Sequence, residues 1–173
     1  MKIALTGHRP KILGGYTESV FQRLRDTAEK AFKVLEPSLV YTGMAQGWDM
    51  EAAKACEKLK INFVAVIPFH DQEKVWPTHI QKEYHRLLSV AAAVECCSED
   101  TYDKRLLFLR NKVLIDHLDH TDESEDVVLA LYDGRTSGGT HHAIEYAMKR
   151  NCTILNAWGL YQGQSDNLSL LEY

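Results

Sequence analysis

Residues 126–146, DVVLALYDGRTSGGTHHAIEY, constrain the fold of this chain more than any other stretch. The apolar, β-branched run at 127–131 is typical of a buried strand, and the residues after Thr140 have helical spacing. A glycine-rich turn joins the two segments. A strand, a glycine turn and a helix in this order point free backbone N–H groups and the helix dipole at a bound anion. The stretch therefore predicts one wall of a nucleotide-type site.

The same alternation of apolar runs and helical patterns continues along the whole chain. Apolar runs span residues 2–6, 39–42, 61–68, 91–97, 127–132 and 152–157. Helical patterns lie between them, including 70–88, which we expect Pro77 to break in two, and 102–118. Runs that are continuously apolar indicate a mostly parallel sheet with helices on both faces. We expect a single α/β domain over residues 1–173, with a polar tail from residue 159 at the surface or in an interface.

Composition limits the partners that we expect. The chain is 45% hydrophobic and 25% charged, as is ordinary for a soluble globular protein, and its formal net charge is −4. That charge and the lack of a basic stripe count against nucleic acid as a partner. No apolar run reaches the roughly 18 residues of a membrane span, and the N-terminus has no signal-peptide pattern. We therefore expect a cytoplasmic protein with no membrane partner.

Neither a metal nor a common cofactor is indicated. The four cysteines form no CxxC pair, and His141 and His142 project about 100° apart on a predicted helix. We therefore expect no metal site. The chain has no GxGxxG with an acid some twenty residues downstream and no GxxxxGK[ST], so an ordinary NAD site and a P-loop ATPase site are disfavoured. We expect no cofactor.

Three glycine-bearing loops follow predicted strand ends, after Thr6, Thr42 and Tyr132. Ligands of parallel sheets bind at the carboxyl ends of the strands, near the switch point, so we expect one composite pocket. The candidate ligand-binding residues are Gly7, His8, Arg9, Gly43, Gly47, Trp48, Asp49, Arg110, Asn111, Asp133, Gly138, Gly139 and Thr140.

Several of these residues have a structural alternative. Arg9 offers a bidentate fork to phosphate or carboxylate, or is an ordinary surface arginine. Asp49 caps the following helix or accepts a hydrogen bond from a ribose hydroxyl. Trp48 stacks on a base or packs in the interior. Arg110 and Asn111 form a polar wall of the pocket or lie on the solvated face of a helix.

The motifs TGHRP, LGGY, TGMAQGWDMEAA, RNKVLID and LYDGRTSGGTHHAIEYA, in this order, resemble the YpsA-like, DUF-type branch of the SLOG superfamily. This superfamily also includes the Smf/DprA proteins and the LOG phosphoribohydrolases. The resemblance covers about nine-tenths of the chain. It implies a modified Rossmann fold that binds a nucleotide or nucleotide-derived ligand, and by analogy a homo-oligomer. Its enzymatic relatives cleave the N-glycosidic bond of nucleoside monophosphates, whereas others are sensors or binders.

The chain departs from the enzymes at one position. LOG proteins place a carboxylate three residues after the threonine of the glycine–threonine step, where this chain has Ala143. Glu145 is two residues further on, rotated by about 200° on the helix. N-glycoside cleavage needs a carboxylate at the sugar. The leading hypothesis is therefore a binder of a nucleotide-derived small molecule, acting as a sensor, carrier or sequestering protein. The alternative is a nucleoside 5′-monophosphate N-glycosidase with Asp49, Asp133 or Glu145 as a relocated acid.

Overall fold

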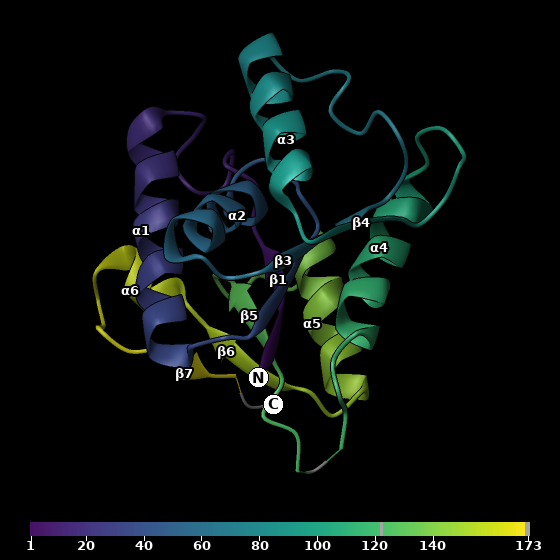
Figure 1. The fold of residues 1–173 in the computed structure, drawn as a ribbon. Helices are drawn as coiled ribbons and strands as arrows, with labels where there is room; N and C mark the ends of the chain where they lie inside the picture. The colour runs from purple at the N-terminus through teal and green to yellow at the C-terminus, as the bar shows by residue number, and fades with distance from the viewer. Residues whose placement is uncertain (122, 172–173) are drawn as a thin grey trace.

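The computed structural model shows a single α/β domain around a seven-stranded sheet (Figure 1). It describes residues 1–121 and 123–171; residues 122, 172 and 173 of the predicted 1–173 domain lie outside the described residues. The strands are β1 (Lys2–Gly7), β2 (Leu39–Thr42), β3 (Phe63–Ile67), β4 (Ala93–Cys96), β5 (Val127–Leu131), β6 (Thr153–Asn156) and β7 (Ser169–Leu170). The helices are α1 (Glu18–Leu35), α2 (Trp48–Leu59), α3 (Thr78–Val90), α4 (Lys104–Asp116), α5 (Gly139–Lys149) and α6 (Trp158–Gln162).

The sheet has the order β4-β3-β2-β1-β5-β6-β7; among the described residues the β6–β7 pair is antiparallel and the other pairs are parallel. β1 lies between β2 and β5 and is parallel to both. The chain builds outward from β1 to β4 on one side, then returns to β5 on the other side of β1. The carboxyl ends of β1 and β5 therefore form the switch point of the sheet, where open α/β folds bind their ligands.

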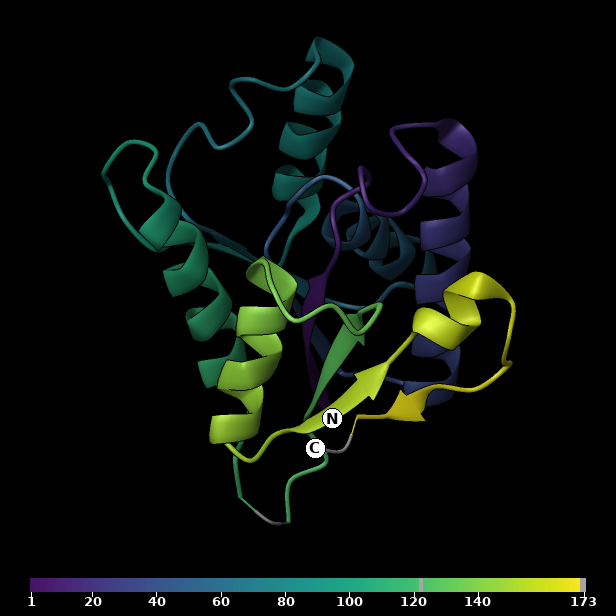
Figure 2. The same cartoon turned by 180° about the vertical axis from the view of Figure 1, so that it is seen from behind.

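Helices cover both faces of the sheet, as the two opposite views show (Figures 1 and 2). α1, α2, α3 and α6 contribute to one hydrophobic cluster, and α4 and α5 to the other. Neighbouring residues of one strand serve different clusters: Ile3 and Leu5 belong to the first, and Ala4 to the second. Burial on both faces explains why central strands such as β3 and β5 are continuously apolar, and the predicted Rossmann-like fold is confirmed.

The predicted helix at 70–88 is wrong in its first half. Residues 70–75 form turns, with hydrogen bonds from Lys74 N to Asp71 O and from Trp76 N to Glu73 O. Asp71 has a φ of 61°, in the left-handed region, so a right-handed helix cannot run through it. The helix starts only after Pro77, whose fixed φ suits the beginning of a helix.

The tail after residue 159 is more than a polar surface segment. It carries the end of α6 and all of β7, and Tyr161 is 3% exposed. The Tyr161 hydroxyl donates a hydrogen bond of 2.7 Å to Leu13 O, which ties the tail to the loop after β1. The apolar pattern of α6 is only five residues long, too short for helical periodicity to be recognised in the sequence. Within the described residues, every helix is too short or too polar to span a lipid bilayer.

Candidate functional site

A pocket of about 330 Å³ lies at the switch point. The end of β1 and the residues after it form one side, from Thr6 to Arg9, and the start of α5 forms another, from Ser137 to Thr140. α4 closes the pocket with Lys104, Phe108, Arg110 and Asn111 among others. The volume is within the range of small-molecule sites. Of the predicted residues, Gly7, His8, Arg9, Asp49, Arg110, Asn111, Gly138, Gly139 and Thr140 line it.

The amino end of α5 forms the wall that the glycine turn predicted (Figure 2). Gly138 occupies the N-cap position with a φ of 97°, and no side chain among the described residues caps the helix. Asn111 donates a hydrogen bond of 3.2 Å from Nδ2 to Gly139 O, so α4 holds the first turn of α5 in place. An uncapped helix start carries free N–H groups and partial positive charge. This wall therefore favours an anion.

Two cations in the pocket are not neutralised by the protein. Arg9 and Lys104 are exposed, and neither forms an ion pair with any of the described residues. Lys104 lies over the Phe108 ring at 6.0 Å, which positions its ammonium group at the pocket. Together with the start of α5, these side chains give the pocket a positive field although the chain as a whole is acidic.

Arg110 and Asp49 form a buried ion pair in the wall of the pocket. Each is 6% exposed, and Arg110 Nη1 lies 3.4 Å from Asp49 Oδ2 and also donates to Gly43 O. Asp49 Oδ2 accepts a hydrogen bond of 3.3 Å from Ala45 N. Burial raises the pKa of Asp49, and the Arg110 charge opposes that shift. The pair closes the turn between β2 and α2, so Arg110 does not lie on a solvated helix face. Asp49 binds Ala45 N in the turn and does not cap α2, whose N-cap residue is Gly47.

His8, Asp133 and Arg135 form a chain of polar contacts at the rim. His8 Nε2 lies 2.8 Å from Asp133 Oδ1, and Arg135 donates to both oxygens of the same carboxylate. The hydrogen bonds from Arg135 hold the pKa of Asp133 well below its usual range. Burial lowers the pKa of His8, against the attraction of Asp133. Asp133 is thus ionised and fully engaged with protein groups, and it does not itself line the pocket.

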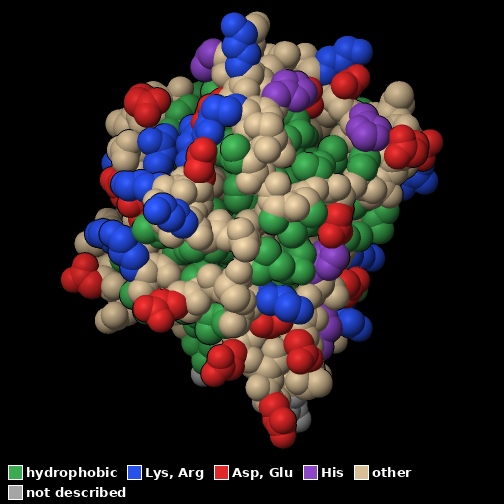
Figure 3. Space-filling model, in the orientation of Figure 1, with side chains coloured by type: hydrophobic (Ala, Val, Ile, Leu, Met, Phe, Trp, Pro, Cys, Tyr) green, Lys and Arg blue, Asp and Glu red, His purple; other side chains and the backbone are tan. Residues whose placement is uncertain are grey.

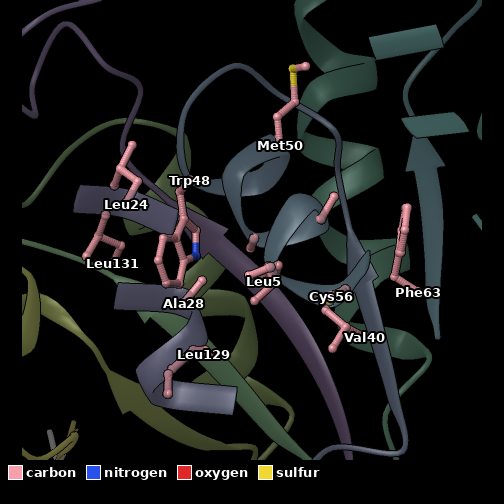
Figure 4. Packing of buried hydrophobic residues seen from close by; sticks show 14 of the residues in the cluster. Leu5, Leu24, Ala28, Val40, Trp48, Met50, Cys56, Phe63, Leu129 and Leu131 are labelled. Carbon is pink, nitrogen blue, oxygen red and sulfur yellow. The ribbon is translucent and has the colours of Figure 1, made fainter. Parts of the chain in front are cut away.

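Four of the named candidates lie elsewhere. Trp48 is 1% exposed and packs in the core beneath β1 (Figure 4), so the interpretation as a base-stacking residue is wrong. Gly43 and Gly47 shape the β2–α2 turn outside the pocket; a Cβ on Gly47 would lie 2.8 Å from Pro10 Cδ. Glu145 lies outside as well, 3.4 Å from His142 Nδ1, in a separate groove between α4 and α5.

Sequence reasoning missed several pocket residues. Arg135 and Ser137 lie between Gly134 and Gly138 in the very turn that was singled out, so their position was available as a signal. Lys104 and Phe108 come from α4, whose pattern showed only that it is a helix. Across the described residues, no three His, Cys, Asp or Glu side chains lie close enough together to hold a metal ion.

These features define a class of protein: a Rossmann-like α/β domain with a positively charged pocket at the switch point of a parallel sheet. The chain belongs to the YpsA family, described as the YspA SLOG family, whose model matches residues 3–155. It is also similar to the uncharacterized SPbeta prophage-derived protein YoqJ of Bacillus subtilis (strain 168). The two are 28% identical over 134 residues, which cover 71% of this chain and 73% of YoqJ.

Two solved structures of DNA processing protein A (DprA) share the fold. The Streptococcus pneumoniae protein matches with a TM-score of 0.61 and 14% identity, over 90% of this chain. This chain spans about half of that protein, 49%. The Helicobacter pylori protein matches with a TM-score of 0.62 and 18% identity, over 95% of this chain and 74% of its own. At these identities the likeness is one of fold.

The exclusion of nucleic acid as a partner is contradicted. The Helicobacter pylori protein, which has this fold, has a single-stranded DNA binding mode. Net charge by itself does not exclude such a partner, because charge is distributed unevenly over the molecule. Lysine and arginine side chains gather over α1 on the face shown in Figure 3, and Arg9 and Lys104 concentrate positive charge at the pocket.

Proposed function

We propose that the protein binds a phosphorylated nucleotide in the switch-point pocket, as a free molecule or as part of a single strand. One observation carries this proposal: the uncapped start of α5 shares a single pocket with Arg9 and Lys104, two cations without an ion-pair partner among the described residues. A phosphate group satisfies all three at once, because it carries charge and several acceptor oxygens. Thr140, which also lines the pocket, offers a hydroxyl donor.

The same geometry supports binding over N-glycoside cleavage. A glycosidase needs a carboxylate that is free to act at the sugar. Asp49 is committed to Arg110 and to the backbone N–H of Ala45, and Asp133 to His8 and Arg135. Glu145 lies outside the pocket. We therefore expect no free base after incubation with AMP, CMP and their deoxy forms; release of base, checked by chromatography, would restore the enzymatic alternative.

Thermal unfolding and titration calorimetry test the binding proposal. The ligands are AMP, dTMP, inorganic phosphate and a 5′-phosphorylated dT6 oligonucleotide, so that free and polymeric sources are compared directly. A ligand present at about 100 times its Kd stabilises the folded state by about 2.7 kcal/mol, which is a shift of several degrees in Tm. Lys104→Ala and Arg9→Ala should each weaken the binding of nucleotide about tenfold.

Arg105→Ala is the matched control. Arg105 follows Lys104 on the same helix, but its side chain is 90% exposed, pairs with Asp103 and lies outside the pocket. It should bind nucleotide as the wild type does. If no member of the panel shifts Tm, or if Lys104→Ala and Arg105→Ala bind equally well, the proposed site is wrong. A cytoplasmic location and assembly into a homo-oligomer stay predictions.

A further inference from the structure

A second pocket adjoins the first. It has a volume of about 440 Å³ and lies between the loop after β3, residues 68–77, and the loop after β4, residues 97–103. Both loops lie beyond the carboxyl edge of the sheet, on the α3 and α4 side of the molecule (Figures 1 and 2). Arg9 and Leu107 line both pockets. The two hollows are therefore adjacent parts of one surface, with the Arg9 side chain at their junction.

The second pocket is lined by three aromatic rings, those of Phe69, Trp76 and Tyr102, whereas the first has the Phe108 ring. Phe69 is 5% exposed and forms its floor, whereas Tyr102 is 69% exposed. Their ring centroids are 5.7 Å apart with the planes at 90°, so Phe69 supports Tyr102 by an edge contact. Trp76 completes the aromatic lining and packs edge-on against Tyr84. A supported but exposed tyrosine ring is a platform on which a planar group can stack.

The charges around this platform match a polyanion with planar groups. Arg9 and Lys74 line the pocket, and neither forms an ion pair with a described residue. His70 adds a third basic side chain, 3.2 Å from Glu99, and Asp71 is the acidic residue of the lining. Proteins that bind single strands combine basic side chains along the backbone with aromatic rings under the bases. This surface has both, in adjacent pockets.

We propose that the ligand is a nucleotide strand of at least two units that spans both pockets. One phosphate lies at the start of α5, the backbone passes Arg9, and the base of a neighbouring nucleotide stacks on Tyr102. This inference rests on the proposed function, since it places the first phosphate in the switch-point pocket. It adds the second pocket as a base-binding site and selects a single strand over a mononucleotide.

Competition binding with the full chain tests the proposal. Binding of a 5′-phosphorylated dT6 carrying a 3′ fluorophore is followed by anisotropy at low salt, and dTMP and unlabelled dT6 serve as competitors. We expect dT6 to bind at least tenfold more tightly than dTMP. Tyr102→Ala should lower the affinity for dT6 about tenfold and leave the affinity for dTMP unchanged, because stacking is lost only where a second base is present. Tyr102→Phe should retain the wild-type affinity for dT6.

Tyr16→Ala is the matched control, since Tyr16 is 59% exposed and lines neither pocket. It should bind both ligands as the wild type does. Equal affinities for dTMP and dT6, or a Tyr102→Ala variant with unchanged affinity for dT6, overturn the strand proposal while the proposed function stands. Binding of neither ligand overturns both. If Lys104→Ala weakens the binding of both ligands and Tyr102→Ala weakens the binding of dT6 alone, the proposed function and the strand proposal are both supported.

Discussion

The turns after β2 and β5 look alike in sequence and differ in the folded protein. Each follows a buried strand, contains glycines and starts a helix. In the β2–α2 turn the protein supplies its own ligands: Arg110 donates to Gly43 O, Asp49 accepts from Ala45 N, and Trp48 packs in the core. No side chain among the described residues caps α2 or α5, so the two turns differ in the buried Arg110–Asp49 pair, which the first has and the second lacks.

The difference shows that a glycine turn before a helix is not by itself a binding site. What decides its role is whether a neighbouring element places a buried cation of the protein's own in the turn. Arg110 comes from α4, 67 residues after Gly43 in the chain, and its guanidinium packs directly against Gly43. From α4 the β5–α5 turn receives Asn111, which donates to the carbonyl of Gly139 and does not contact the N–H groups of the helix start. His8 and Asn156 contact Asp133 and Tyr132 at the beginning of the same turn.

The largest effect should come from removing the charge that fills the first turn. Arg110→Ala leaves the Asp49 carboxylate buried without its partner, and we expect a loss of about 3 kcal/mol in unfolding free energy, which lowers Tm by about 6–12 °C. Arg105→Ala, on the exposed side of the same helix, should change stability by less than about 0.5 kcal/mol. Equal effects of the two substitutions in a thermal melt would show that the β2–α2 turn is not held by Arg110.

A pair of glycine substitutions compares the two turns directly. A Cβ on Gly43 would lie 1.5 Å from Arg110 Nη1, so Gly43→Ala must displace the guanidinium and should destabilise by about 2 kcal/mol. A Cβ on Gly139 would come no closer than 3.9 Å to Asn111 Nδ2, and the position is helical. Gly139→Ala should therefore keep or raise the stability by up to about 1 kcal/mol.

Binding should respond in the opposite way to stability in the Gly139→Ala variant. The new methyl group lies in the switch-point pocket, so nucleotide affinity should fall about tenfold although Tm does not. Denaturant unfolding and calorimetry on the same preparations measure both quantities. A Gly139→Ala variant that unfolds as easily as Gly43→Ala would mean that the second turn is as tightly filled as the first.

The smallest effect that we expect is the contribution of His8 to the pH dependence of the unfolding free energy. Because the pKa of His8 is lower in the folded chain than its ordinary value near 6.5, the unfolded chain binds more protons there. The stabilising contribution is complete above about pH 6.5 and is lost as pH falls through the folded pKa. His8→Asn should flatten this part of the stability curve from urea titrations, and the exposed His79→Asn serves as a control. Identical slopes for His8→Asn and the wild type would contradict this assignment.

Much of the fold was predictable because the central strands, such as β3 and β5, are buried on both faces. Val127 to Leu131 is apolar at every position, which is unusual outside a parallel sheet, and the order of strands and helices follows from such runs. The turn at Asp71 was not predictable, since its left-handed φ interrupts a segment whose composition favours a helix. The sequence did not predict α6, because a helix of five residues is too short to show helical periodicity.

The sequence by itself determined the class of fold, the family and the place of one pocket wall, because strand burial, glycine turns and helix starts are local properties of the chain. Only the tertiary structure decided which turn stays open. Arg110 of α4 contacts Gly43 in the turn after β2. Lys104 and Tyr102 line pockets that they form together with loops from other parts of the chain. Such contacts depend on how separate elements pack, and the spacing of residues along one element carries no record of them.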